Sequence, residues 1–349
     1  MKVSVYEAPK TLTVAEVPDL PLAPDEIRIE TMYSGISHGT EMNVYRGYAP
    51  FFKKEYDPST RLFVEPREEK TWQYPIRSCD EGVWYLGYSS VGKVVEKGPL
   101  AEGVDIGDIV YTDGPHQSQV IRKPEQAFKV PQGVHPKNAI VFTNLITAFN
   151  GILDARIKLG DIVVVMGLGV VGQLVAQMAK LSGGIVVGVD TIDKRRQAAL
   201  DNGADAVFSP LDTDVAKEVR AMSSNRGADV VIDVTGSYHA LNEAIRIIAP
   251  ERTIIAMSWY PNESRLALSE EFHHNRVTIK CSQTNYTAPE FAQIWPIERK
   301  REWCLQLLPK LKLDNILTTT FPFAQINEAF ATVDRHPENI IQCILDYSS

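Results

Sequence analysis

The chain has 349 residues, 44% of them hydrophobic, and its 36 lysines and arginines against 44 aspartates and glutamates give a net charge of −8. This size and composition are typical of a globular protein with two domains, and they exclude a disordered chain. The acidic balance and the lack of a basic tract argue against nucleic acid and anionic membranes as partners. The first residues have no signal-peptide layout, and no stretch approaches the roughly 20 apolar residues that span a bilayer, so we expect a cytoplasmic protein.

The first 140 or so residues are typical of a small, irregular β-barrel. Short β-like runs alternate there with prolines and glycines that break them. The expected strands cover residues 3–6, 12–17, 26–32, 90–96, 108–111 and 119–122.

Residues 45–85 fit neither a strand nor a helix pattern and are unusually rich in aromatic side chains. These are Tyr48, Phe51, Phe52, Tyr56, Phe63, Trp72, Tyr74, Trp84 and Tyr85. Long loops of compact domains are often functional, and such rings would suit stacking on a sugar or a larger ring. The alternative is that most of these rings only anchor an insertion to the barrel.

The middle of the chain alternates between strand and helix patterns. Helical spacing begins near residue 138, and after Gly160 the expected strands cover residues 162–166, 185–190, 206–209, 230–234, 253–257 and 277–281. Six strands joined by crossovers predict an α/β fold with a doubly wound parallel sheet. After residue 285 we expect a helix near 300–311 and a last strand near 341–346. The predicted domains are 1–144, 145–284 and 285–349, the last rejoining the first.

A glycine-rich motif, Gly167-Leu168-Gly169-Val170-Val171-Gly172, stands between the apolar run 162–166 and a helix pattern over 170–182. In this context the motif predicts a dinucleotide site. The first glycine permits the tight turn, the second lets a pyrophosphate approach the backbone, and the third lets the helix pack closely on the sheet. The N–H groups at the start of the helix would meet the phosphate charge.

An acidic residue, Asp190, closes the second apolar run of this region. Its carboxylate can accept the hydroxyls of the adenosine ribose and would repel a ribose phosphate, which favours NAD over NADP as the cofactor. The neighbouring basic residues Lys194, Arg195 and Arg196 weaken that preference.

The layout and several motifs resemble the medium-chain dehydrogenase/reductase superfamily of the alcohol dehydrogenase type. The motifs are residues 35–41 (GISHGTE), 86–92 (LGYSSVG), 107–108, 147–149, 167–172 and 229–236. The resemblance covers essentially the whole chain and implies a Rossmann domain with a discontinuous GroES-like catalytic domain. Residues 35–41 and 87–92, with Asn275-Arg276 and Ser282-Gln283, look most like the branch that contains bacteriochlorophyllide a dehydrogenase.

The positions that hold zinc in metal-dependent members of the superfamily differ in this chain. Where those members have a cysteine, a His-Glu pair and a further cysteine or carboxylate, the resemblance aligns Ser37, Tyr88-Ser89 and Thr143. Such hydroxyls are poor Zn²⁺ ligands. The four cysteines Cys79, Cys281, Cys304 and Cys343 are scattered without metal-binding spacing. We therefore expect a member without zinc.

Without a metal, side chains must handle the proton that accompanies hydride transfer. The candidates are His38, Tyr88 and His116, with Ser37 and Thr40 as relays. In the superfamily the residue at the position of His38 often touches the cofactor pyrophosphate, and the resemblance implies that Tyr88 lies near the nicotinamide. The usual pKa of a tyrosine, about 10, would have to be lowered before Tyr88 could act as a base. Each candidate can equally be a hydrogen-bonded residue of a pocket wall.

Further cofactor contacts follow from the resemblance alone. Thr147 would face the nicotinamide, Thr235 and Gly236 would end the fourth strand of the sheet beside the cofactor, and Arg276 and Ser282 would flank its nicotinamide half.

The sequence thus predicts a zinc-independent, NAD(H)-dependent oxidoreductase that interconverts a secondary alcohol and a ketone. Its substrate would be a polyol, a sugar derivative or a hydroxyethyl-bearing ring compound. A quinone or enoyl reductase, and an NAD-binding sensor or structural protein without turnover, remain as alternatives. We also expect a homodimer, formed by edge-to-edge pairing of the strand at residues 277–281.

Overall fold

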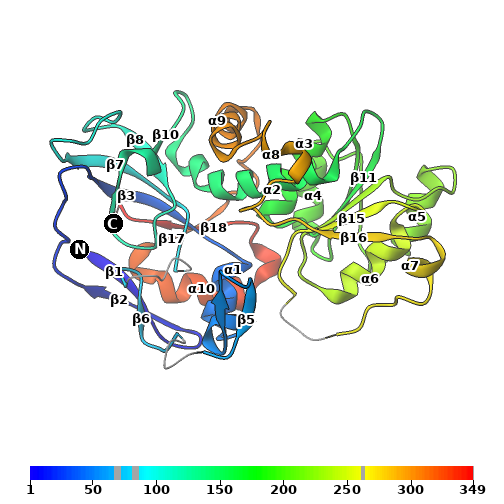
Figure 1. The fold of residues 1–349 in the computed structure, drawn as a ribbon, viewed down its shortest axis with the longest axis horizontal. Coiled ribbons are helices and arrows are strands. Elements are labelled where there is room, and N and C mark those ends of the chain that lie inside the picture. Colours follow the sequence, from blue (N-terminus) through cyan, green and yellow to red (C-terminus); the bar gives the residue numbers. More distant parts are fainter. Residues whose placement is uncertain (67–71, 81–85, 261–263, 349) are drawn as a thin grey trace. The chain divides into compact units, whose positions relative to one another are not determined.

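The computed structural model describes residues 1–66, 72–80, 86–260 and 264–348, which divide into two compact units (Figure 1). The first unit contains Met1–Ile140 together with the C-terminal residues from Leu317 on, and the second contains Val141–Ile316. Residues 285–316 therefore lie in the second unit, whereas the sequence had suggested that the chain leaves it at 285. Their helix α9 (Ile297–Leu307) packs against α2 (Phe142–Ala155) of the same unit.

The first unit is rich in β-structure and is built around one long strand. This strand, β3 (Ile27–Ile36), pairs with β7 (Ser90–Lys97), β9 (Gln119–Arg122) and β18 (Cys343–Asp346). The sheet continues through β8 (Ile109–Thr112) to β10 (Phe128–Lys129) on one side and ends at β17 (Thr319–Pro322) on the other. In Figure 1 the red strand β18 lies among the blue and cyan strands of this unit.

Two smaller sheets and short helices complete the first unit. One sheet has the order β2 (Thr11–Glu16), β1 (Lys2–Ala8), β6 (Ile76–Arg77), and the other pairs β4 (Glu55–Asp57) with β5 (Leu62–Val64). The helices are α1 (Thr40–Tyr45) and α10 (Ile326–Arg335), with 3-10 turns at Pro50–Phe52, Pro124–Gln126, Pro136–Val141, Phe323–Gln325 and Pro337–Asn339. Alternate residues of the strands point into apolar cores, as in antiparallel sheets with one solvated face.

The second unit has a six-stranded parallel sheet. Its strands are β11 (Ile162–Met166), β12 (Ile185–Val189), β13 (Ala206–Phe208), β14 (Val230–Asp233), β15 (Thr253–Ala256) and β16 (Thr278–Cys281). The spatial order, β13-β12-β11-β14-β15-β16, is that of a Rossmann fold and confirms the predicted doubly wound sheet. All five residues of β11 are buried, because helices cover both faces of such a sheet, which explains the continuous apolar runs.

The helices of the second unit follow the strands as crossovers. Besides α2 and α9 they are α3 (Val170–Leu181), α4 (Asp193–Asp201), α5 (Val215–Met222), α6 (Tyr238–Ile247), α7 (Glu271–His274) and α8 (Pro289–Ala292), with a 3-10 turn at Leu308–Lys310. Among the described residues, we find no helix with both the length and the apolar character to cross a membrane.

Candidate active site

The glycine-rich motif forms the turn from β11 to α3, and two of its glycines cannot be replaced without strain. Gly167 has a φ of +87°, in the left-handed region. A Cβ on Gly172 would lie 1.8 Å from the carbonyl oxygen of Gly167, so the helix can approach the turn only with a glycine here. The remaining glycine of the motif, Gly169, has no heavy atom within 4 Å of the position that a Cβ would take. Open space therefore lies in front of Gly169.

That space adjoins the start of α3. Gly169 is the N-cap residue and, as a glycine, has no side chain that could cap the first N–H groups of the helix, which include those of Val170 and Val171. Free N–H groups and the positive end of a helix together bind phosphate groups. The turn thus fits the pyrophosphate of a dinucleotide.

Asp190 follows β12 and is tied to the same turn. One oxygen of its carboxylate accepts the backbone N–H of Leu168 at 2.7 Å, and the other accepts that of Ile192 at 2.8 Å. The Nη1 atom of Arg195 lies 3.8 Å from the carboxylate, and burial lowers the pKa of this guanidinium. Arg196 instead donates to the backbone carbonyl of Asp190 at 2.8 Å. The structure brings an acidic acceptor and one cation together beside the glycine turn.

The end of β14 contacts the turn as well. Cγ2 of Thr235 lies 2.9 Å from where Gly167 would carry a Cβ, so the two residues are in contact. Thr235 donates to Asp233 through its N–H at 2.9 Å and its hydroxyl at 2.6 Å, and the Tyr260 hydroxyl donates to the other oxygen of that carboxylate at 2.7 Å. Burial raises the pKa of Asp233. Gly236 follows with a φ of +69°. Sequence reasoning missed Asp233 and Tyr260 as residues that hold Thr235.

Of the remaining predicted cofactor contacts, Ser282 lies at the carboxyl end of β16 and Thr147 lies within α2. The Ser282 hydroxyl accepts from Nδ2 of the buried Asn150 at 3.2 Å, and Thr147 donates to the carbonyl of Thr143 at 3.0 Å. The prediction that Arg276 flanks the nicotinamide half of the cofactor is wrong. It precedes β16, at the opposite edge from Ser282, and pairs with Glu251 at 3.2 Å. Because cofactors bind at the carboxyl ends of parallel strands, Arg276 does not flank this site.

In the first unit, three of the predicted side chains form a cluster of hydroxyls. Tyr88 donates to Oγ of Ser37 at 2.5 Å, the N–H of Thr40 donates to the same oxygen at 3.3 Å, and the Thr40 side chain also bonds Tyr88. Burial, with a smaller contribution from the charge of Glu41, raises the pKa of Tyr88 to about 12. The shift is opposite to the one a base needs, so Tyr88 is a proton donor at neutral pH. His38 lies half-buried at the turn before α1.

His116 lies on the loop between β8 and β9, as predicted, with its side chain inside the first unit. Its side chain is fully buried, with Nδ1 2.8 Å from Oγ of Ser34 and Nε2 2.9 Å from Oε2 of Glu41. Glu41 is also fully buried. Sequence reasoning had not connected Glu41 with His116, because 75 residues separate them and no local pattern signals the contact.

The residues at the positions that bind zinc in metal-dependent members of the superfamily are not strong metal ligands. The hydroxyls of Ser37 and Tyr88 bond each other, Ser89 donates to the carbonyl of Ile140, and Thr143 belongs to α2 in the second unit. Zn²⁺ prefers thiolate, imidazole and carboxylate donors, and this set offers none, so it does not fit a catalytic zinc. Within the described ranges, no three His, Cys, Asp or Glu side chains are grouped to hold a metal.

The aromatic side chains of residues 45–80 divide into two groups. Phe51, Phe52, Trp72 and Tyr74 pack against the core of the first unit, as anchoring rings do. Tyr48, Tyr56 and Phe63 are exposed. Trp84 and Tyr85 lie outside the described residues.

A Rossmann sheet of this order, a glycine turn at its first crossover and an acidic residue after its second strand define a nucleotide-dependent dehydrogenase. Comparisons with known proteins agree. Residues 170–297 match the family model of the zinc-binding dehydrogenases. The chain is 32% identical to the D-guloside 3-dehydrogenase of Escherichia coli (strain K12), over 98% of this chain and 99% of that protein. The protein belongs to the medium-chain dehydrogenase/reductase superfamily of zinc-binding alcohol dehydrogenase-like enzymes.

A more distant relative and a solved structure are also similar to this chain over nearly its whole length, the second of them in its fold. The 2-dehydro-3-deoxy-L-galactonate 5-dehydrogenase of Pseudoalteromonas atlantica is 25% identical, over 97% of each chain. The crystal structure of an Escherichia coli CFT073 alcohol dehydrogenase in complex with NADH superposes with a TM-score of 0.75, at 19% identity and over 99% of each chain. The protein is thus an oxidoreductase of the medium-chain dehydrogenase type.

Proposed function

We propose that this protein is an NAD(H)-dependent, zinc-independent dehydrogenase that interconverts a secondary hydroxyl of a sugar derivative and a ketone. The observation that carries the proposal is the contrast between an intact dinucleotide turn and a metal position converted to hydroxyls bonded to one another. The sugar is favoured because a relative that is 32% identical over nearly the whole chain is a D-guloside 3-dehydrogenase. We retain the bacteriochlorophyllide branch, suggested by residues 35–41, only as a prediction about lineage.

The residues of the second unit would hold the cofactor. Its pyrophosphate would lie in the open space at Gly169 against the start of α3, and Asp190 would accept the ribose hydroxyls. When bound, the nicotinamide supplies the hydride acceptor. We propose NAD over NADP because Asp190 is fixed in place by two backbone N–H groups, so a ribose phosphate would meet its charge. Arg195 offsets part of that repulsion.

The hydroxyl cluster would handle the proton. With a pKa of about 12, Tyr88 keeps its proton at neutral pH and can donate it to a carbonyl oxygen during ketone reduction. In the oxidative direction the proton returns to the cluster and must then be passed on, because Ser37 and Thr40 are only weakly basic. The mechanism therefore requires a further acceptor near Tyr88.

The test combines metal analysis with a substrate panel on the same sample. Purified protein treated with a chelator is assayed with NAD and NADP on glycosides, polyols and hydroxyethyl compounds, and with NADH and NADPH on enones and quinones. We expect NAD-dependent oxidation of a sugar derivative without bound zinc. Reduction of enones or quinones would instead assign a quinone or enoyl reductase, and NAD binding without any turnover would assign a sensor or structural protein. Activity lost with the chelator and restored by Zn²⁺ would contradict the proposal.

We also propose a homodimer, in which β16 pairs with its counterpart in a second copy. β16 is the last strand of the six-stranded sheet, so one of its edges is available for such pairing. Light scattering that shows only a 38.9 kDa species would contradict this.

A further inference from the structure

A row of four hydrogen-bonded side chains runs through the first unit. Glu41 bonds His116, His116 bonds Ser34, and the Ser34 hydroxyl lies 2.9 Å from the hydroxyl of Tyr347. The first three side chains are fully buried. They come from α1, from the segment before β9, and from β3, and Tyr347 directly follows β18. Four distant segments of the chain therefore contribute to one row.

The inner end of the row is a carboxylate oxygen that accepts no hydrogen bond from the described residues. Oε1 of Glu41 is buried and has no hydrogen-bond partner among the described residues. A buried carboxylate oxygen without a donor costs free energy, so its presence calls for a functional reason. Glu41 also directly follows Thr40, which bonds Tyr88, and the charge of Glu41 reaches the Tyr88 phenol. The unsatisfied oxygen thus lies close enough to the hydroxyl cluster to affect it electrostatically, but no described hydrogen bond joins the two, so a proton must cross between them through a bridging water or a side-chain movement.

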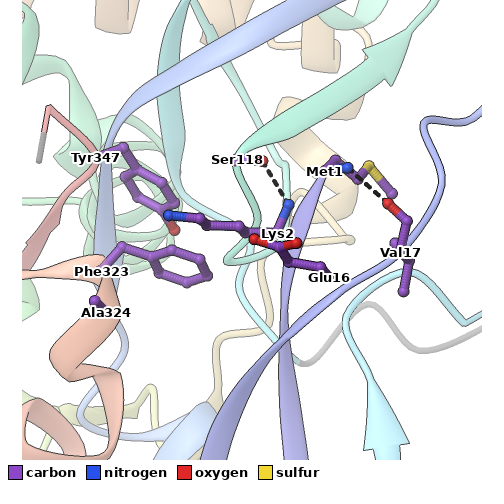
Figure 2. Close-up of a pocket in the computed structure, with 8 residues that line it drawn as sticks. All are labelled: Met1, Lys2, Glu16, Val17, Ser118, Phe323, Ala324 and Tyr347. Atoms are coloured by element: carbon purple, nitrogen blue, oxygen red, sulfur yellow. Dashed lines mark hydrogen bonds between the residues drawn. The ribbon is translucent and has the colours of Figure 1, made fainter.

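The outer end of the row opens into a pocket. Tyr347 lines a cavity of about 380 Å³ together with Lys2, Glu16, Ser118 and Phe323 (Figure 2). The Tyr347 ring stacks on that of Phe323 with centroids 4.4 Å apart, which fixes its orientation. The backbone N–H of Tyr347 donates to Met32 on β3 at 3.1 Å. Tyr347 is therefore a half-buried residue between the buried row and the pocket, and burial raises the pKa of its phenol, so the phenol keeps its proton except when the row supplies another.

We propose that the row Glu41–His116–Ser34–Tyr347 is a proton path that connects the hydroxyl cluster with the pocket at Tyr347. The proposal rests on the dehydrogenase function, which needs a way out for the substrate's proton. The carboxylate and the imidazole can each gain and lose a proton, and the two hydroxyls can each donate and accept a hydrogen bond, as a proton relay requires. A purely structural buried pair would need neither an unsatisfied oxygen at one end nor a tyrosine that lines a pocket at the other.

The transfer balances along the row. A proton from the hydroxyl cluster binds Oε1 of Glu41, and the proton that Oε2 of Glu41 shares with Nε2 of His116 stays on Nε2. His116 gives its Nδ1 proton to Ser34, Ser34 gives its hydroxyl proton to Tyr347, and Tyr347 releases its own proton to water in the pocket. Every step forms one bond to hydrogen and breaks one, and the net charge of the row is unchanged. Ketone reduction runs the same steps in reverse.

The first test does not depend on enzymatic activity. In protein labelled with ¹⁵N-histidine, the His116 imidazole N–H signals are assigned by their loss in His116→Asn, and their exchange with water is measured. We expect Tyr347→Phe and Ser34→Ala to slow this exchange at least about tenfold, because each removes one link while Phe keeps the ring stacking. Tyr74→Phe is the matched control, since the Tyr74 hydroxyl donates to the carbonyl of Val44, outside the row. Equal exchange in all variants would overturn the proposal.

The second test measures turnover. Tyr347→Phe should lower kcat about tenfold or more without changing KM, and added imidazole, which is small enough for the pocket, should restore it. Tyr74→Phe should show neither effect. A fall in kcat that no added buffer restores would contradict the path. If the exchange result holds but the wild-type protein turns over no alcohol, the path stands and the dehydrogenase proposal fails. If the wild-type protein turns over an alcohol but the exchange is unaffected in the variants, the dehydrogenase proposal stands and the proton path fails.

Discussion

Replacing Gly169 by alanine separates cofactor binding from folding. The added methyl group would meet no heavy atom within 4 Å, and the φ of −66° suits any residue. Alanine is a poorer N-cap than glycine but restricts the unfolded chain, so the two effects offset and we expect a stability change within about 1 kcal/mol. In the complex, phosphate oxygens that bond backbone N–H groups come to about 2.7–3.2 Å from the nitrogens, which leaves no room for a methyl group.

The expected loss of affinity follows from those bonds. Displacing the pyrophosphate from Gly169 weakens about two charge-assisted hydrogen bonds, each contributing about 1.5 kcal/mol or more, so Kd for NAD should rise about 100-fold. Gly172→Ala is the contrasting variant. Its Cβ would lie 1.8 Å from the Gly167 carbonyl oxygen, so α3 must shift, which costs about 1–3 kcal/mol and lowers Tm by several degrees even without ligand.

Calorimetric titration with NAD and thermal unfolding of the ligand-free protein measure both effects. Gly169→Ala should keep the wild-type Tm and lose binding, whereas Gly172→Ala should lose both. If Gly169→Ala binds NAD as tightly as the wild type, the open space at this residue is not the phosphate site. If its Tm falls as far as that of Gly172→Ala, the assumed geometry of the turn is wrong.

Three further outcomes are expected. Asp190→Ser should weaken NAD binding about 10- to 100-fold by removing a charged acceptor, while NADP binding changes less; an unchanged NAD to NADP ratio would show that Asp190 does not select the cofactor. Tyr88→Phe should lower kcat for ketone reduction about 100-fold, with a smaller loss for Ser37→Ala, and an unaltered rate would remove Tyr88 from the mechanism. Stability should fall as pH rises from 10 to 12, because burial raises the pKa of both Tyr74 and Tyr88 from 10.0 to about 12 and the folded state keeps protons that the unfolded state has lost. This stability is fully present below pH 10; an absorbance titration without phenols of midpoint near 12 would contradict it.

The second unit was predictable because its signals are local. Buried parallel strands require continuous apolar runs, and the strand at residues 162–166 agrees with β11 at both ends. The glycine turn also depends on neighbours within six residues, Gly167 to Gly172. The placement of Asp190 beside Leu168 follows from the parallel pairing of β11 with β12.

The chemistry of the first unit was less accessible because it depends on contacts between distant segments. His116 lies on a loop, as predicted, but the sequence does not show that Glu41 and Ser34 enclose its side chain in the interior. Tyr88 was recognised from its position, but the direction of its pKa shift depends on burial, which the sequence does not reveal. The short strands β4, β5 and β6 were missed because two or three residues carry no periodicity.

Strand β18 lies between β3 and β17, so the sheet of the first unit cannot be completed until residues 343–346 have left the ribosome. The nascent chain from 1 to 140 must wait while 141–342 are translated, which takes on the order of 10–40 s at about 5–20 residues per second. The Rossmann unit, complete at residue 316, is free to form during that interval. A premature stop codon between residues 317 and 343 would therefore spare the Rossmann unit and leave β3 without β18 as its neighbour.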